Sequence, residues 1–276
     1  MDFVDFQRGT CYNYSINLAR VFMKELTGKF KDVDLRITSD NKFIWTINGK
    51  DIVKKFTLTK DKLYQQFRQV GYTCPYSREN KQDYISESLE HCHIPYMNFV
   101  YYYFVWENMR IPSLDEFFNA YIERYCIPVW DMDAYRFSSE YVNLPMFFTR
   151  EEILGRLARG YNSYNRELQS LLEMKEHKDL KVEWSFRDDT VRGIDMGVTY
   201  KNQYFGIASY VNTSRSVEWK EEYKNTTRHD YSKITMIDLK AELQADSESC
   251  FDLNGIRLYK PSCIQKLYER ITQAAS

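Results

Sequence analysis

Residues 181–211 read KVEWSFRDDTVRGIDMGVTYKNQYFGIASYV, and this stretch decides the fold class. Polar and apolar residues alternate over 181–186, and a second short run of similar character covers 193–198 after the turn-like residues 187–190. Both runs predict short strands. A hairpin turn at Asn202 and Gln203 leads into 204–211, which is too apolar for an exposed loop and too short for a typical helix. We therefore expect a third, central strand there.

Asp195 is the candidate site residue of this stretch. It lies between Ile194 and Met196 in a strand that reads as buried, where a carboxylate without a partner or a metal would be costly. We expect it beside the middle of the third strand, near Tyr210, as an oxygen ligand for Mg²⁺. Glu183 occupies an alternate position of the first strand, which directs it either to the same cleft or to solvent.

The same residues carry a resemblance to a known family. Residues 193–195, the hairpin, Gly206-Ile207 and residues 213–216 resemble the PD-(D/E)xK restriction-endonuclease superfamily, and are most similar to the TaqI-type restriction endonucleases. Residues 114–121 and 161–168 are similar to segments that precede the active-site Asp of that family. The resemblance covers roughly the second half of the chain.

The resemblance implies a fold, a chemistry and a set of site residues. The fold is α+β or α/β, with a restriction-endonuclease-like mixed sheet core flanked by helices. The activity is Mg²⁺-dependent cleavage of DNA, as in restriction or phage-defence nucleases. Asp195 corresponds to the metal-binding Asp, and Glu167 to the helix carboxylate that helps to hold the ion.

The third strand departs from the family pattern. The family has an acid or Gln and then a Lys there, whereas residues 208–210 are Ala-Ser-Tyr. Tyr210, with an ordinary pKa of about 10, cannot replace an ammonium group. The missing cation could come from Arg215, Lys220 or Lys224, because phosphoryl transfer needs positive charge near the reacting phosphate. Alternatively, the chain is a catalytically inactive nuclease-like subunit that binds nucleic acid or a protein partner in a defence complex.

Binding to nucleic acid would depend on a local basic surface, because the net charge of the chain is only −1. One segment offers helically spaced basic side chains that could follow phosphates. These candidate nucleic-acid contacts are Arg215, Lys220, Lys224, Arg228, His229 and Lys233. A solvated mixed-charge helix is the alternative interpretation of this segment.

The first part of the chain predicts two further units. Residues 1–75 read as a small α+β unit, in which Asn48-Gly49 is a strong hairpin signal between two strands and 61–70 is a helix. Residues 76–145 read as a helical region with Ser113 as an N-cap. The predicted core, 146–276, begins with a helix capped by Thr149 that either extends to about residue 175 or breaks near Gly160.

Cysteine usage and hydropathy exclude other classes of protein. The six cysteines are scattered and form no CxxC pair, so the sequence does not predict a zinc site. The chain starts without the features of a signal peptide, and no apolar run reaches the roughly 18 residues of a membrane span. We therefore expect a cytoplasmic protein without membrane attachment.

Overall fold

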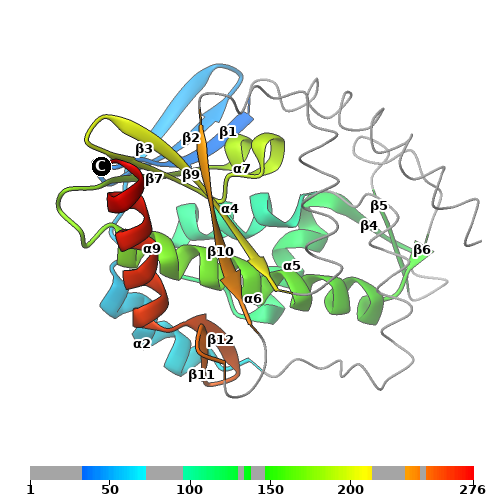
Figure 1. Cartoon of the computed structure of the whole chain (residues 1–276). Coiled ribbons are helices and arrows are strands. Elements are labelled where there is room, and N and C mark those ends of the chain that lie inside the picture. The colour runs from blue at the N-terminus through cyan, green and yellow to red at the C-terminus, as the bar shows by residue number, and fades with distance from the viewer. Residues whose placement is uncertain (1–32, 73–95, 130–133, 138–146, 213–233, 243–246) are drawn as a thin grey trace, which may run out of the picture.

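The structure is a computed structural model that describes residues 33–72, 96–129, 134–137, 147–212, 234–242 and 247–276. These residues form a mixed α+β fold with a seven-stranded sheet (Figure 1). The strands lie in the order β10-β9-β8-β7-β1-β2-β3. Their bounds are β1 Val33–Ile37, β2 Lys42–Ile47, β3 Lys50–Lys55, β7 Lys181–Ser185, β8 Met196–Tyr200, β9 Gln203–Val211 and β10 Thr235–Ala241.

The sheet is mixed because β10 runs parallel to β9 while every other neighbouring pair is antiparallel. Strand β1 pairs with β7 through Arg36 opposite Ser185 and Ile37 opposite Trp184. The strands predicted for the N-terminal unit and those predicted for the core therefore belong to one continuous sheet.

Two tight hairpin turns connect neighbouring strands. Asn48 and Gly49 join β2 to β3 with positive φ angles of 51° and 70°, which confirms the predicted hairpin. The turn between β8 and β9 consists of Lys201 and Asn202, with φ angles of 46° and 64°. It lies one residue earlier than predicted, because Gln203 already pairs as the first residue of β9.

The segment between β7 and β8 differs from the prediction. Residues 187–190, expected as a turn, belong to the helix α7 Phe186–Arg192. The Ser185 hydroxyl caps this helix by accepting a hydrogen bond from the Asp188 amide, and Gly193 ends it in the left-handed region with a φ of 62°. Strand β8 therefore starts only at Met196, and Asp195 lies just ahead of it rather than inside it.

Five more helices lie in the described ranges: α2 Lys60–Val70, α4 Met97–Asn108, α5 Leu114–Tyr125, α6 Arg150–Met174 and α9 Pro261–Ala274. The predicted N-caps are confirmed, since Ser113 and Thr149 both form capping boxes. Two small antiparallel sheets complete the fold. One contains β4 Cys126–Val129, β5 Ala134–Phe137 and β6 Phe147–Phe148, and the other contains β11 Cys250–Leu253 and β12 Ile256–Tyr259.

Helix α6 is the central element of the core. It contacts α2, α4, α5, α9, β7 and β12, with the β4-β5-β6 sheet near its start and α9 near its end (Figure 1). Almost every residue of its second half is buried. Polar residues on this half of α6 therefore lie inside the protein rather than on its surface.

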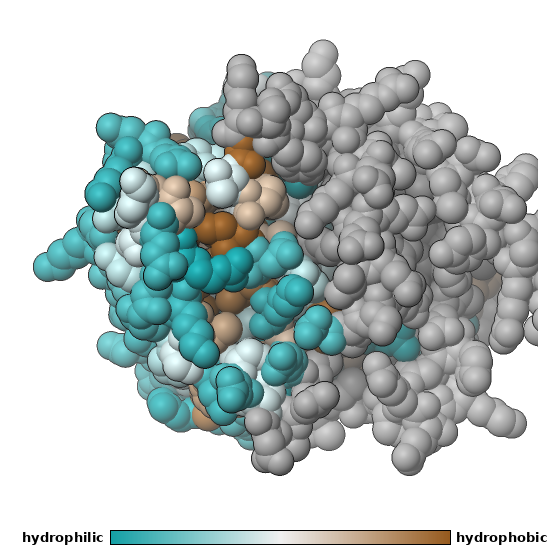
Figure 2. All heavy atoms as spheres, in the orientation of Figure 1, coloured by the Kyte–Doolittle hydropathy of each residue, from teal (hydrophilic) through white to brown (hydrophobic). Residues whose placement is uncertain are grey.

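Aromatic side chains fill much of the space around α6. Tyr101, Tyr102 and Tyr161 are fully buried, and the Tyr102 ring stacks on Trp184 of β7 with centroids 3.7 Å apart. The described part of the face in Figure 2 is mostly hydrophilic, with smaller hydrophobic patches. None of the helices in the described ranges has the length and apolar character needed to cross a membrane.

Candidate metal centre

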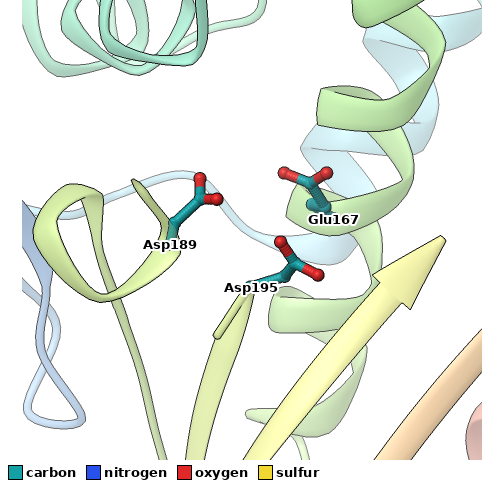
Figure 3. A group of neighbouring side chains, drawn as sticks. All are labelled: Glu167, Asp189 and Asp195. Carbon is teal, nitrogen blue, oxygen red and sulfur yellow. The ribbon is translucent and has the colours of Figure 1, made fainter. Parts of the chain in front are cut away.

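Three carboxylates from separate elements converge beside α6. Glu167 lies on α6, Asp189 on α7, and Asp195 in the link between α7 and β8 (Figure 3). One oxygen from each carboxylate lies within 4.8 Å of the others. We call these three residues the acidic cluster.

Glu167 is the most deeply buried member of the acidic cluster. Its side chain sits in the buried half of α6, and the residue is only 7% exposed. The Oε1 atom accepts a hydrogen bond of 3.2 Å from the Ser163 hydroxyl, whereas Oε2 is buried without a partner. Burial, and then the charges of Asp195 and Asp189, raise the pKa of Glu167 well above its ordinary value.

The two aspartates are half-buried, and neutral donors hold one oxygen of each. The Asn98 side-chain amide on α4 donates to Asp189 Oδ2 over 2.9 Å. The backbone amide of Ser209 on β9 donates to Asp195 Oδ2 over 2.5 Å. Asp195 also donates its own backbone N–H to the Ile207 carbonyl, which ties the link before β8 to the third strand of the meander.

The acidic cluster fits a single divalent cation of the oxygen-binding kind. Opposite ligands lie about 4.2 Å apart around Mg²⁺ and about 4.8 Å apart around Ca²⁺, as their bond lengths require. The cluster oxygens all lie within 4.8 Å of one another, which is close enough for one such ion to contact all three. Carboxylate oxygens also suit Mn²⁺. The partnerless Oε2 of Glu167 is the atom that most needs such an ion, because a buried acceptor without a donor is costly.

The charge of Glu167 acts on two tyrosines, Tyr102 and Tyr164. The Tyr102 hydroxyl is fully buried and has no hydrogen-bond partner. Burial raises the pKa of Tyr102, and among the charges that raise it further Glu167 has the largest effect. Burial, followed by Glu167 and Asp189 among the carboxylates, likewise raises the pKa of Tyr164.

The structure brings together the two acids predicted from the sequence, Glu167 and Asp195, but it places other candidates elsewhere. Tyr210, in the position where a Lys was expected, donates its hydroxyl to Asp238 Oδ2 over 3.1 Å. Glu183 does not belong to the acidic cluster. It lines a separate hollow of about 230 Å³ together with Asp34 and Asp188.

The predicted basic surface lies outside the described residues. The structure therefore gives no position for its members, which are Arg215, Lys220, Lys224, Arg228, His229 and Lys233. They remain predictions from the sequence.

Asp189 was not among the residues predicted from the sequence. The sequence predicted a turn at 187–190, and a predicted turn does not define where the side chain of Asp189 points. A signal was present: Ser185 is a good N-cap, Asp188 and Asp189 fall in the first helical turn, and Gly193 is a good C-terminal stop. Reading those residues as a short helix would have placed Asp189 on a defined face.

Comparisons with known proteins add no relative to this description. No family model matches the chain, and no match was found among the curated proteins or among the solved structures.

Proposed function

We propose that the protein is a divalent-cation-dependent phosphodiesterase that cleaves DNA, with a restriction-endonuclease-like core and an atypical active site. The observation that carries this proposal is the convergence of Glu167 and Asp195, within 4.8 Å, in a buried acidic cluster that contains an oxygen without a partner. Mg²⁺ is the proposed cofactor, and Mn²⁺ is expected to replace it.

The arrangement of elements supports the proposal. A helix, α6, supplies one carboxylate, and the entry to the second strand of a β7-β8-β9 meander supplies another. The resemblance seen in the sequence pairs a helix carboxylate with a strand Asp in this way, within a mixed sheet flanked by helices. The core at 146–276 is accordingly proposed to be restriction-endonuclease-like.

The chain's own residues have distinct roles in this proposal. A divalent cation supplies a Lewis acid that polarises a phosphoryl oxygen and offsets the charge that develops there. Asp195 holds the cation, and Glu167 supports it from the protein interior. The Ser163 hydroxyl and the Ser209 amide fix the orientation of these two carboxylates through hydrogen bonds.

The cation that the third strand lacks has to come from another part of the chain. Tyr210 carries a phenol rather than an ammonium group, and its hydroxyl is already bonded to Asp238. We propose that Arg215, Lys220 or Lys224 binds the scissile phosphate. If none of them does so, the protein is the inactive nuclease-like subunit, which binds nucleic acid or a protein partner without cutting.

The test is incubation of the purified chain with plasmid DNA, linear DNA and RNA, in Mg²⁺, in Mn²⁺ and in EDTA. Asp195→Asn removes a negative charge without changing the shape of the side chain. We expect cleavage of DNA by the wild-type protein with Mg²⁺ or Mn²⁺, and its loss in EDTA and in Asp195→Asn.

Asp61→Asn is the matched control, because Asp61 is an exposed residue in the first turn of α2 and lies outside the acidic cluster. It should cut as the wild type does. Cleavage that survives in Asp195→Asn would refute the assignment of the site. Binding of DNA without cleavage, measured at low salt where phosphate contacts are strongest, would favour the inactive subunit.

A further inference from the structure

The resemblance to the endonuclease family accounts for two of the three carboxylates in the acidic cluster. In that family the third strand supplies a further acid or Gln, but here Ala208 on β9 is buried and offers only a methyl group. We propose that Asp189 of α7 is the third cation ligand and takes the place of the absent third-strand ligand. This inference deepens the proposed function and rests on its cation site.

The two neighbouring acids of α7 are used differently. Asp188 forms an ion pair of 3.2 Å with Arg192, one helical turn along α7. Asp189 instead lies with Glu167 and Asp195, its carboxyl oxygen within 4.8 Å of theirs (Figure 3). Three neighbouring carboxylates repel one another unless one of them is protonated or a cation lies between them, and a cation bound by all three would relieve this repulsion.

The position of Asp189 is fixed by contacts from two other elements. Asn98 on α4 donates to Asp189 Oδ2 over 2.9 Å. Asp34 on β1 anchors the start of α7, because its Oδ1 accepts hydrogen bonds from the Ser185 hydroxyl at 3.3 Å and from the Arg187 amide at 3.2 Å. Asp189 is therefore oriented before any ion binds, as expected for a preorganised ligand.

Buried polar atoms without partners provide a second, independent observation. Glu167 is 7% exposed and its Oε2 atom has no hydrogen-bond partner, and its carboxyl group lies beside those of Asp189 and Asp195 (Figure 3). The Tyr102 hydroxyl is also buried and unpartnered. Buried polar atoms rarely lack a partner, so we expect a bound ion beside them. Asp189 and Asp195 are only half-buried.

The test measures cation binding directly, on the full chain and without a nucleic-acid substrate. Mn²⁺ binding is followed by calorimetry, and Tb³⁺ binding by luminescence excited through the neighbouring tyrosines. The variants are Asp189→Asn, Asp189→Glu, Asp195→Asn and, as the matched control, Asp188→Asn. An Asn at 189 keeps an oxygen that can accept from Asn98, so a purely structural role would survive that change.

We expect Asp189→Asn to weaken Mn²⁺ binding about tenfold or more, Asp189→Glu to recover part of the loss, and Asp188→Asn to bind like the wild type. Wild-type affinity in Asp189→Asn, with binding lost in Asp195→Asn, would overturn the inference and leave the proposed function standing. Absence of Mn²⁺ and Tb³⁺ binding by the wild-type protein would overturn both. Circular dichroism in EDTA shows whether each variant is folded. If Asp189→Asn does not fold, the Mn²⁺ affinity of Asp189→Glu is compared with that of the wild type instead.

Discussion

Replacing Glu167 with Gln should leave the cation-free protein nearly as stable as the wild type, yet remove most of its stabilisation by Mn²⁺. Glu167 is buried among carboxylates, and its pKa is raised well above the ordinary value, first by burial and then by Asp195 and Asp189. We therefore expect Glu167 to be the member of the cluster that is protonated when no cation is bound. A Gln side chain has the same shape as a protonated Glu and the same absence of charge.

The distances in the acidic cluster set the size of the effect. Two unit charges 4.8 Å apart repel by about 3.5 kcal/mol at an effective dielectric constant of about 20. An ionised Glu167 would meet this repulsion twice, so protonation is the less costly state without a cation. We expect Glu167→Gln to change the free energy of unfolding in EDTA by less than about 1 kcal/mol.

With a bound cation, the wild type should be more stable than Glu167→Gln. At a concentration 100-fold above the dissociation constant, Mn²⁺ stabilises the folded state by about 2.7 kcal/mol. For a chain of 276 residues this raises the melting temperature by about 5 °C. A variant whose affinity has fallen about 100-fold should gain less than about 1 °C at the same concentration.

The assay is thermal unfolding by calorimetry in EDTA and in Mn²⁺. Glu151→Gln is the control, because Glu151 lies on the same helix but is exposed. A fall of several degrees for Glu167→Gln in EDTA would show that Glu167 is ionised and needed for folding. An unchanged Mn²⁺ shift in Glu167→Gln would show that Glu167 is not a ligand. Either result refutes the reasoning.

Two further predictions concern stability. Tyr101→Phe should destabilise the protein by about 1–3 kcal/mol, because the Tyr101 hydroxyl donates to Asn165 Oδ1 over 2.6 Å. Tyr102→Phe should be neutral or stabilising, because the Tyr102 hydroxyl has no hydrogen-bond partner. Urea unfolding that ranks the two variants in the opposite order would contradict this. Arg110 holds the pKa of Glu116 at about 2, below the ordinary 4.5, so this carboxylate stabilises the fold above about pH 4.5 and the effect is lost as the pH falls through about 2. Glu116→Gln should flatten the stability profile between those values, and parallel profiles for variant and wild type would rule this out.

The sequence was sufficient for the elements whose signals are local. Asn48-Gly49, Ser113 and Thr149 carry turn and cap chemistry within a few residues, and the structure confirms each of them. The start of β8 was less predictable, because Ile194 and Met196 fit a strand equally well whether it begins before or after Asp195. The Asp195 amide already donates to the Ile207 carbonyl, as the amide of a strand residue would. The two possible starts of β8 therefore differ by a single residue.

Helix α7 depends on information that is distant in the chain. Seven residues are too few to show a helical repeat, and its first turn is anchored by Asp34, about 150 positions earlier. The same strand, β1, pairs with β7 and joins the N-terminal hairpin to the sheet that carries Asp195. A reading that treats residues 1–75 as a separate unit cannot see this contact, so it lacks the anchor that holds α7 against the sheet.

The absence of the Lys and the presence of Asp189 both affect the net charge of the acidic cluster. With Asp189 in place of the third-strand ligand and no Lys, the proposed centre is more negative than the family pattern implies, which would strengthen its attraction for a divalent cation. Even so, with Glu167, Asp189 and Asp195 all ionised, a doubly charged cation would leave one negative charge, and a DNA phosphate would add another. On the proposed function, cleavage would therefore require positive charge beyond the cation. Within this chain the predicted basic segment that contains Arg215 and Lys220 is the candidate source, and without it the same centre would bind a cation but not cut.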